Sequence, residues 1–175
     1  MLSKEDYDIV LATSTGALPA WMARKYPEVE RVDYEGRRHK FGQRHNACPN
    51  SEIFRKYSVA LAAKLAERYA SNPHVKCWHV SNEYGGTCYC ENCEKAFRIW
   101  LRKKYGTLDA VNKAWNTEFW GHTFYDWEEI VAPNSLSEGL WDERSAFAGL
   151  SIDYKRFNSD SMLQNYMDER DAIRK

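Results

Sequence analysis

The sequence predicts an α/β chain that forms a section of a larger parallel sheet or barrel, and three observations lead to that fold class. Two short apolar runs with β-branched residues, at 7–13 and 75–81, are typical of buried parallel strands. A long amphipathic segment separates them, as in a βαβ unit. No further run of this kind follows, although buried strands need neighbours at their edges. The remaining strands are therefore expected outside these residues.

The composition of the chain excludes several classes of protein. Its 175 residues suffice for one domain with a core, and its 25 basic residues balance 25 acidic ones, so no net charge attracts nucleic acid or an anionic membrane. No apolar stretch approaches the roughly 20 residues of a membrane helix. The N-terminal "MLSKEDYDIVLATST" is charged where a signal peptide is apolar. We expect a soluble, cytoplasmic protein that binds neither nucleic acid nor membranes.

The first half of the chain is predicted to hold one helix between the two strands. After the first strand, residues 17–29 are punctuated by proline, with room for one helical turn, and 33–51 form a long polar loop. Ser51 is a good N-cap for the helix. Its apolar face repeats every four residues at Ile53, Tyr57, Leu61, Leu65 and Tyr69. Cys77, inside the second strand, is expected in the core.

The second half is predicted to be helical, with one irregular interruption. Residues 93–106 form an amphipathic helix that ends at Gly106, and 107–115 form a shorter one. The segment 116–134 is rich in aromatic residues and broken by Gly and Pro, which indicates a loop. The last residues, 162–175, are again typical of a helix.

Three crowded cysteines indicate a metal site. Cys88, Cys90 and Cys93 form a C-x-C-x2-C motif, and Cys48 offers a fourth thiolate from the polar loop. Four thiolates are the closed tetrahedral ligand set of structural zinc, which leaves no position for a reacting water. The predicted zinc therefore joins two loops and takes no part in chemistry. The alternative is four unligated thiols, but crowded cysteines in a polar loop have no packing purpose.

Asn82 and Glu83 follow the second predicted strand. In a parallel barrel the C-terminal ends of the strands carry the active site. A carboxylic acid there can protonate a leaving oxygen and later deprotonate a water, and an adjacent amide can hold a substrate hydroxyl. The alternative for Glu83 is a loop carboxylate that pairs with backbone N–H groups or an arginine.

The motifs from "CWHVSNEYGGTCYCENC" to "NKAWNTEFWGH" strongly resemble the catalytic barrel of family 42 glycoside hydrolases, the bacterial β-galactosidases. Upstream "GQRHNACPNS" and downstream "DYKRFNSDSMLQNYMDERDAIRK" extend the resemblance over nearly the whole chain. It implies a (β/α)8 TIM barrel of which residues 1–175 form a partial domain. That part covers about the third and fourth βα units, and the C-terminal half of the barrel is absent.

The resemblance also implies roles for individual residues. Glu83 matches the acid/base of a retaining β-galactosidase, and Asn82 matches a residue that bonds the 2-hydroxyl of the sugar. Arg44 and Trp120 match residues of the galactose subsite, although a solvated loop arginine and simple core packing are the alternatives. The matched ligands of a structural zinc are Cys48, Cys88, Cys90 and Cys93. The family further implies a galactoside substrate and a homo-oligomer, a trimer.

The second catalytic carboxylate is the departure from the family pattern. Retaining hydrolysis needs a nucleophile about 5 to 5.5 Å from the acid/base, and the family places it on a later strand. The late carboxylates of this chain lie in helical sequence and are not credible substitutes: Asp153, Asp160, Asp168, Glu169 and Asp171. We therefore expect a fragment that is inactive alone. The opposing class is a non-enzymatic, zinc-stapled module for carbohydrate binding or assembly.

Overall fold

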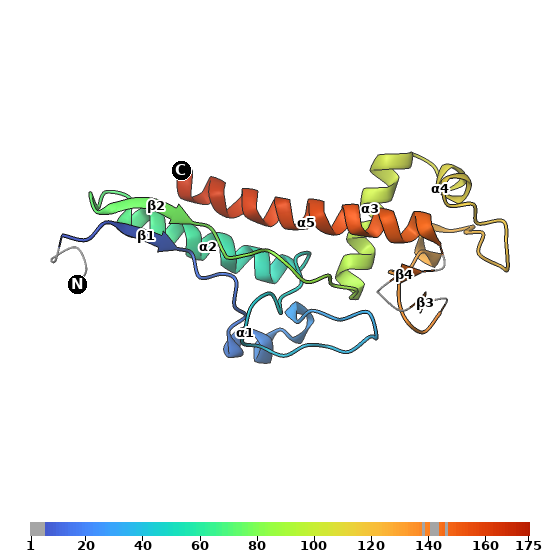
Figure 1. Ribbon diagram of the computed structural model, residues 1–175, viewed down its shortest axis with the longest axis horizontal. Coiled ribbons are helices and arrows are strands. Elements are labelled where there is room, and N and C mark those ends of the chain that lie inside the picture. Colours follow the sequence, from blue (N-terminus) through green and yellow to red (C-terminus); the bar gives the residue numbers. More distant parts are fainter. Residues whose placement is uncertain (1–5, 138, 141–143, 146) are drawn as a thin grey trace.

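The structure, a computed structural model, describes residues 6–137, 139–140, 144–145 and 147–175 (Figure 1). The first five residues of the charged N-terminal stretch lie outside this description. The long helix α5 (Ala148–Arg174) runs beside α2 (Glu52–Tyr69) at one end of the molecule and crosses α3 (Glu91–Tyr105) toward the other. Among the described residues, no helix is both long and apolar enough to cross a membrane.

The predicted βαβ unit is confirmed. Strand β1 (Ile9–Ala12) pairs in parallel with β2 (Val75–His79), with Leu11 opposite Trp78, and α2 lies between them in the chain. The parallel order places the C-terminal ends of both strands at the same edge of the pair. Thr13 and Ser81, which follow the two strands, therefore lie close together.

Helix α2 begins as the sequence predicts, but it buries a different face. The hydroxyl of Ser51 accepts a hydrogen bond from the backbone N–H of Phe54 at 3.2 Å, as an N-cap does. The buried residues of the helix are Ser58, Ala62 and Ala66, whereas Leu61 of the predicted apolar face is exposed. Small side chains at four-residue spacing let α5 approach α2 closely, so this contact decides which face is covered.

The remaining elements surround the strand ends and the far half of α5. Helix α1 (Ala20–Lys25) and the 3-10 helix Pro27–Val29 precede the irregular loop. Helix α4 (Leu108–Trp115) follows α3. Gly106 ends α3 with a φ of 77°, which matches the predicted glycine stop. The last short elements are the 3-10 helix Trp127–Glu129 and the antiparallel strands β3 (Gly139–Leu140) and β4 (Arg144–Ser145).

The main core lies where α3, α4 and α5 meet. Phe97 of α3 is fully buried and contacts the ring of Tyr154 of α5 edge-on, with 4.9 Å between ring centroids. It also stacks on Trp115 of α4 at 6.2 Å. The four cysteines Cys48, Cys88, Cys90 and Cys93 belong to the same buried cluster. The cysteine site is thus built onto the aromatic core of the helices.

The two strands are more exposed than the sequence predicts. Val10 is 65% exposed, and Cys77, expected in the core, is also exposed, so that prediction is wrong for the described chain. The reason is that β1 and β2 form a two-stranded sheet among the described residues, and one face of each strand has no covering layer. Apolar strand residues with this exposure need more sheet or another surface to cover them.

Candidate functional site

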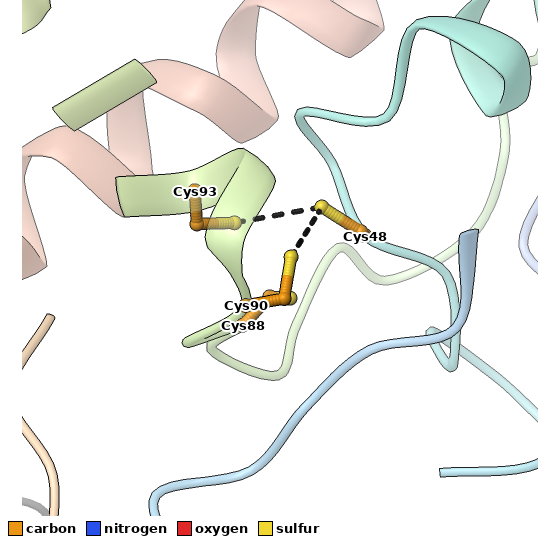
Figure 2. A group of neighbouring side chains, drawn as sticks. All are labelled: Cys48, Cys88, Cys90 and Cys93. Atoms are coloured by element: carbon orange, nitrogen blue, oxygen red, sulfur yellow. Dashed lines mark hydrogen bonds between the residues drawn. The ribbon is translucent and has the colours of Figure 1, made fainter. Parts of the chain in front are cut away.

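The structure brings all four predicted cysteine ligands together in a buried cluster. The sulfurs of Cys48, Cys88, Cys90 and Cys93 all lie within 4.8 Å of one another. Cys48 Sγ is 3.5 Å from Cys93 Sγ and 3.4 Å from Cys90 Sγ (Figure 2). All four are buried, and none forms a disulfide. Cys48 comes from the loop before α2, Cys88 and Cys90 directly precede α3, and Cys93 lies in the first turn of that helix.

This geometry fits a tetrahedral metal ion. Four sulfurs around a zinc ion, with Zn–S bonds of about 2.3 Å, are separated by about 3.8 Å, close to the separations in the cluster. The contact with Cys48 lowers the pKa of Cys90, whereas the contacts with Cys88 and Cys90 raise the pKa of Cys48. The thiols therefore compete for shared protons, and a divalent cation can take the place of those protons.

Neighbouring groups fix the position of the cysteine cluster. Asn50 Nδ2 donates to Cys93 Sγ at 3.4 Å, and the hydroxyl of Tyr154 donates to the backbone carbonyl of Cys88 at 2.7 Å. The first contact comes from the loop that carries Cys48, and the second comes from α5. Partners of this kind orient the ligands of a metal site. The cluster thus joins the loop before α2 to the start of α3 and to α5.

Glu83 lies in a turn directly after β2 and forms an ion pair with Arg44. Both side chains are accessible, Arg44 at 64% and Glu83 at 70% exposure. The turn is conformationally unusual, because Ser81 has a φ of 54° and Glu83 a φ of 26°, in the left-handed region that ordinary residues rarely adopt. The structure thus joins two residues that lie 39 positions apart and aims both at solvent at the strand ends.

Arg31 fastens together the two loops that carry this pair, a role that sequence reasoning missed. Its Nε donates to the carbonyl of His45 at 3.1 Å, and its Nη1 donates to the carbonyl of Thr87 at 3.0 Å. Gly86 lies against the guanidinium, since a Cβ there would be 3.2 Å from Arg31 Cζ. No spacing in the sequence indicates this contact, because one arginine reaches two loops that are distant in the chain.

A second unpredicted group lies beneath the turn. The carboxylate of Glu169 is buried on α5 and accepts hydrogen bonds from the hydroxyls of Thr13 and Thr15. Burial raises the pKa of Glu169, and the two hydroxyl contacts oppose that rise. Glu169, His45 and Tyr84 all line a cavity of about 40 Å³. Burial has the opposite effect on the pKa of His45 and lowers it, because burial disfavours the charged imidazolium.

The sequence does contain a signal for Glu169. The buried face of α5 continues from Tyr154 and Phe157 to polar residues at four-residue spacing, which are Ser161, Asn165 and Glu169. Polar residues in line with an apolar face indicate buried hydrogen bonds. Asn165 confirms this pattern, because its amide donates to the carbonyl of Pro49 at 2.7 Å.

Asn82 lies beside the ion pair, whereas Trp120 does not join it. Asn82 is half-buried between Ser81 and Glu83, close to Gly16, where an added Cβ would be 3.4 Å from Asn82 Cβ. Trp120 is 82% exposed and stacks on Phe119 with 5.3 Å between ring centroids. Its loop follows α4, away from the ends of β1 and β2 (Figure 1). Within the described chain, Trp120 is therefore not part of the core.

Comparisons with known proteins agree with one another. The family model that matches residues 1–175 is that of glycoside hydrolase family 42, described as beta-galactosidase. Beta-galactosidase BgaP of Planococcus sp. (strain L4) is 66% identical over 165 residues, which cover 94% of this chain and 24% of that protein. Beta-galactosidase LacZ of Lactobacillus acidophilus is 53% identical over 176 residues, which cover 99% of this chain and 26% of that protein.

A solved structure gives the same result. The crystal structure of beta-galactosidase from Bacillus circulans sp. alkalophilus matches with a TM-score of 0.94 and 64% identity, over 98% of this chain and 26% of that one. The chain therefore spans about a quarter of the length of these relatives. Because the family model covers every residue, the chain belongs to glycoside hydrolase family 42.

Proposed function

We propose that the chain is part of the catalytic barrel of a retaining β-galactosidase that hydrolyses terminal β-D-galactosides. The proposal places β1 and β2 as about the third and fourth strands of a (β/α)8 barrel, with residues 1–175 as a partial domain. The observation that carries it is the pairing of Arg44 with Glu83 at the C-terminal ends of two parallel strands. The names of the relatives supply the substrate class.

In this proposal Glu83 is the general acid/base. As an acid it protonates the glycosidic oxygen as the bond to the anomeric carbon breaks, and as a base it then takes a proton from the incoming water. Arg44 lies next to this carboxylate and has guanidinium donors for sugar hydroxyls. Asn82, the preceding residue, donates to the 2-hydroxyl, a contact that strengthens in the transition state.

The nucleophile and the wall of the subsite complete the proposal. Every late carboxylate named above, from Asp153 to Asp171, lies on α5, as the sequence predicts. We therefore place the nucleophile on a later strand of the full-length protein. Trp120 lies away from Glu83 within this chain, but it presents an exposed ring that can pack on the apolar face of a sugar. We further propose a cytoplasmic homo-oligomer, a trimer by resemblance.

The decisive experiment is Glu83→Ala in the full-length protein. With an activated aryl galactoside, which needs little protonation to leave, the variant should form the glycosyl-enzyme but hydrolyse it slowly. Azide should restore turnover, because it attacks without a base. Asn82→Ala is the matched comparison, and it should lower the rate with every substrate and not respond to azide. Near-normal turnover of lactose by Glu83→Ala would exclude Glu83 as the acid/base.

For the metal, we propose one structural zinc ion held by Cys48, Cys88, Cys90 and Cys93. Their closed, buried arrangement supports this assignment. Metal analysis of protein purified under reducing conditions should find close to one equivalent of zinc, and Cys48→Ser should lower that content and the melting temperature. Cys77→Ser is the control, since its thiol is exposed and outside the cluster. Less than about half an equivalent in the wild type, or paired cysteines, would contradict the proposal.

A further inference from the structure

A chain of hydrogen bonds runs from α5 to the turn that carries Glu83, and it begins at the buried carboxylate of Glu169. Glu169 is 2% exposed, and among the described residues no cation forms an ion pair with it. A buried carboxylate without a cation is unfavourable unless its hydrogen bonds are well made. Its Oε2 accepts from Thr13 Oγ1 at 2.9 Å and from Thr15 Oγ1 at 2.7 Å.

The hydroxyl of Thr13 links Glu169 to the end of β2. A threonine hydroxyl has one proton, and at Thr13 the carboxylate of Glu169 accepts it. The lone pairs of the same oxygen then face the backbone N–H of Ser81, which donates to it at 2.8 Å. Thr13 and Ser81 are both buried, so water does not replace this hydrogen bond.

Ser81 is the residue at which the chain leaves β2 and turns. Its φ of 54° is costly for a residue other than glycine, asparagine or aspartate, and it persists only where the surroundings fix it. Asn82 and Glu83 follow immediately, and the backbone conformation of Ser81 sets the direction in which they point. The hydrogen bond at the N–H of Ser81 thus holds the backbone two residues before Glu83.

We propose that Glu169 is a positioning residue, which orients the Thr13 hydroxyl so that it holds the Ser81 turn and thereby the carboxyl group of Glu83. This inference rests on the proposed function of Glu83. Neither Glu169 nor Thr13 touches the substrate in this scheme. Their contribution is to keep Glu83 within reach of the leaving oxygen, where a small displacement costs much of the proton transfer.

The experiment compares two aryl galactosides in the full-length protein. A phenyl leaving group needs protonation by Glu83, whereas a 2,4-dinitrophenyl group does not. The readout is the ratio of kcat/KM for the phenyl substrate to that for the dinitrophenyl substrate. A variant that merely lowers the amount of folded protein lowers both values equally and leaves this ratio unchanged.

Four variants separate the possible outcomes. Thr13→Val removes the hydroxyl but keeps the shape, and it should lower the ratio about tenfold. Thr13→Ser restores the hydroxyl and should restore the ratio. Glu169→Gln should lower the ratio by a smaller factor. Asp171→Asn, which removes an exposed ion pair of α5 with Arg170, is the control and should leave the ratio unchanged.

The inference is overturned if folded Thr13→Val and Glu169→Gln keep the wild-type ratio. It is also overturned if neither variant folds, because the network then acts on the stability of the whole protein. Failure of the proposed function looks different. In that case Glu83→Ala itself shows no dependence on the leaving group and no response to azide, whatever the behaviour of the Thr13 variants.

Discussion

At the scale of single residues, Asp153 shows how a buried charge is stabilised in this protein. It lies on α5 and accepts hydrogen bonds from the hydroxyl of Tyr105 at 2.7 Å and the indole N–H of Trp115 at 3.0 Å, and it forms an ion pair with Lys104. Burial alone raises the pKa of Asp153, but these donors more than offset it, so its pKa is lowered. The folded protein therefore binds this proton less tightly than the unfolded chain does.

The lowered pKa of Asp153 makes the stability of the folded protein depend on pH. The stability that Asp153 contributes is present above the unfolded pKa of about 3.9 and is lost as the pH falls through the lower folded value. Asp153→Asn in the full-length protein should therefore lower the free energy of unfolding by about 2 kcal/mol at pH 7. Thermal unfolding should show this difference shrinking below about pH 4.

Asp160→Asn is the control for this prediction. Asp160 is exposed on the same helix and accepts from the indole N–H of Trp100 at 2.8 Å, a hydrogen bond that an asparagine oxygen can also accept. Asp160→Asn should therefore change the free energy of unfolding little, both at pH 7 and below about pH 4. A difference between wild type and Asp153→Asn that stays constant down to pH 3 would contradict the assigned sign.

At the scale of elements, α5 connects the core, the cysteine cluster and the strand ends. Its start is tightly packed, because a Cβ added at Gly149 would be 2.4 Å from Trp115 Cδ1 of α4. Gly149 is the second residue of α5, so Gly149→Ala gains less than the roughly 1 kcal/mol of an interior position, whereas overpacking typically costs about 1 to 3 kcal/mol. We therefore expect a net loss of stability in the full-length protein.

The measurement for Gly149→Ala is the melting temperature. Ser159→Ala, on the exposed face of α5, is its matched control, because it gains propensity without a new contact and should leave the melting temperature equal or slightly raised. A higher melting temperature for Gly149→Ala would show that α4 and α5 are less closely packed than the structure indicates.

At the scale of the whole molecule, the exposed apolar residues predict how residues 1–175 behave alone. Val10 of β1, Leu61 of α2 and Leu163 of α5 are 65%, 44% and 56% exposed. Two strands with open edges and helices with uncovered apolar positions favour association. Residues 1–175 expressed alone should elute as oligomers in size-exclusion chromatography and bind a hydrophobic dye. A monodisperse monomer that unfolds cooperatively would contradict the barrel interpretation.

Much of the fold could be predicted from local sequence. The two strands, the N-cap at Ser51, the glycine stop at Gly106 and the order of the helices depend on contacts between neighbours in the chain. Cys88, Cys90 and Cys93 could also be grouped, because thiolates at short spacing have few uses other than metal binding, and Cys48 was the cysteine that the polar loop offered as a fourth. Glu83 could be placed after a strand, because the apolar run that ends at Ser81 identifies the strand locally.

The sequence by itself determined the two parallel strands, the start of α2, the helices α3 and α4, the last part of α5 and the position of Glu83 after a parallel strand. It did not show that α5 begins as early as Ala148. Only the tertiary structure decided which face of α2 is buried, that Cys77 is exposed, and that Arg31 and Glu169 support the strand-end turns. These features depend on packing between segments far apart in the chain, as with Thr13 and Glu169, 156 positions apart. Periodicity and spacing predict the structure of a segment from its own residues. Burial and hydrogen bonding depend on which other segment the fold places beside it.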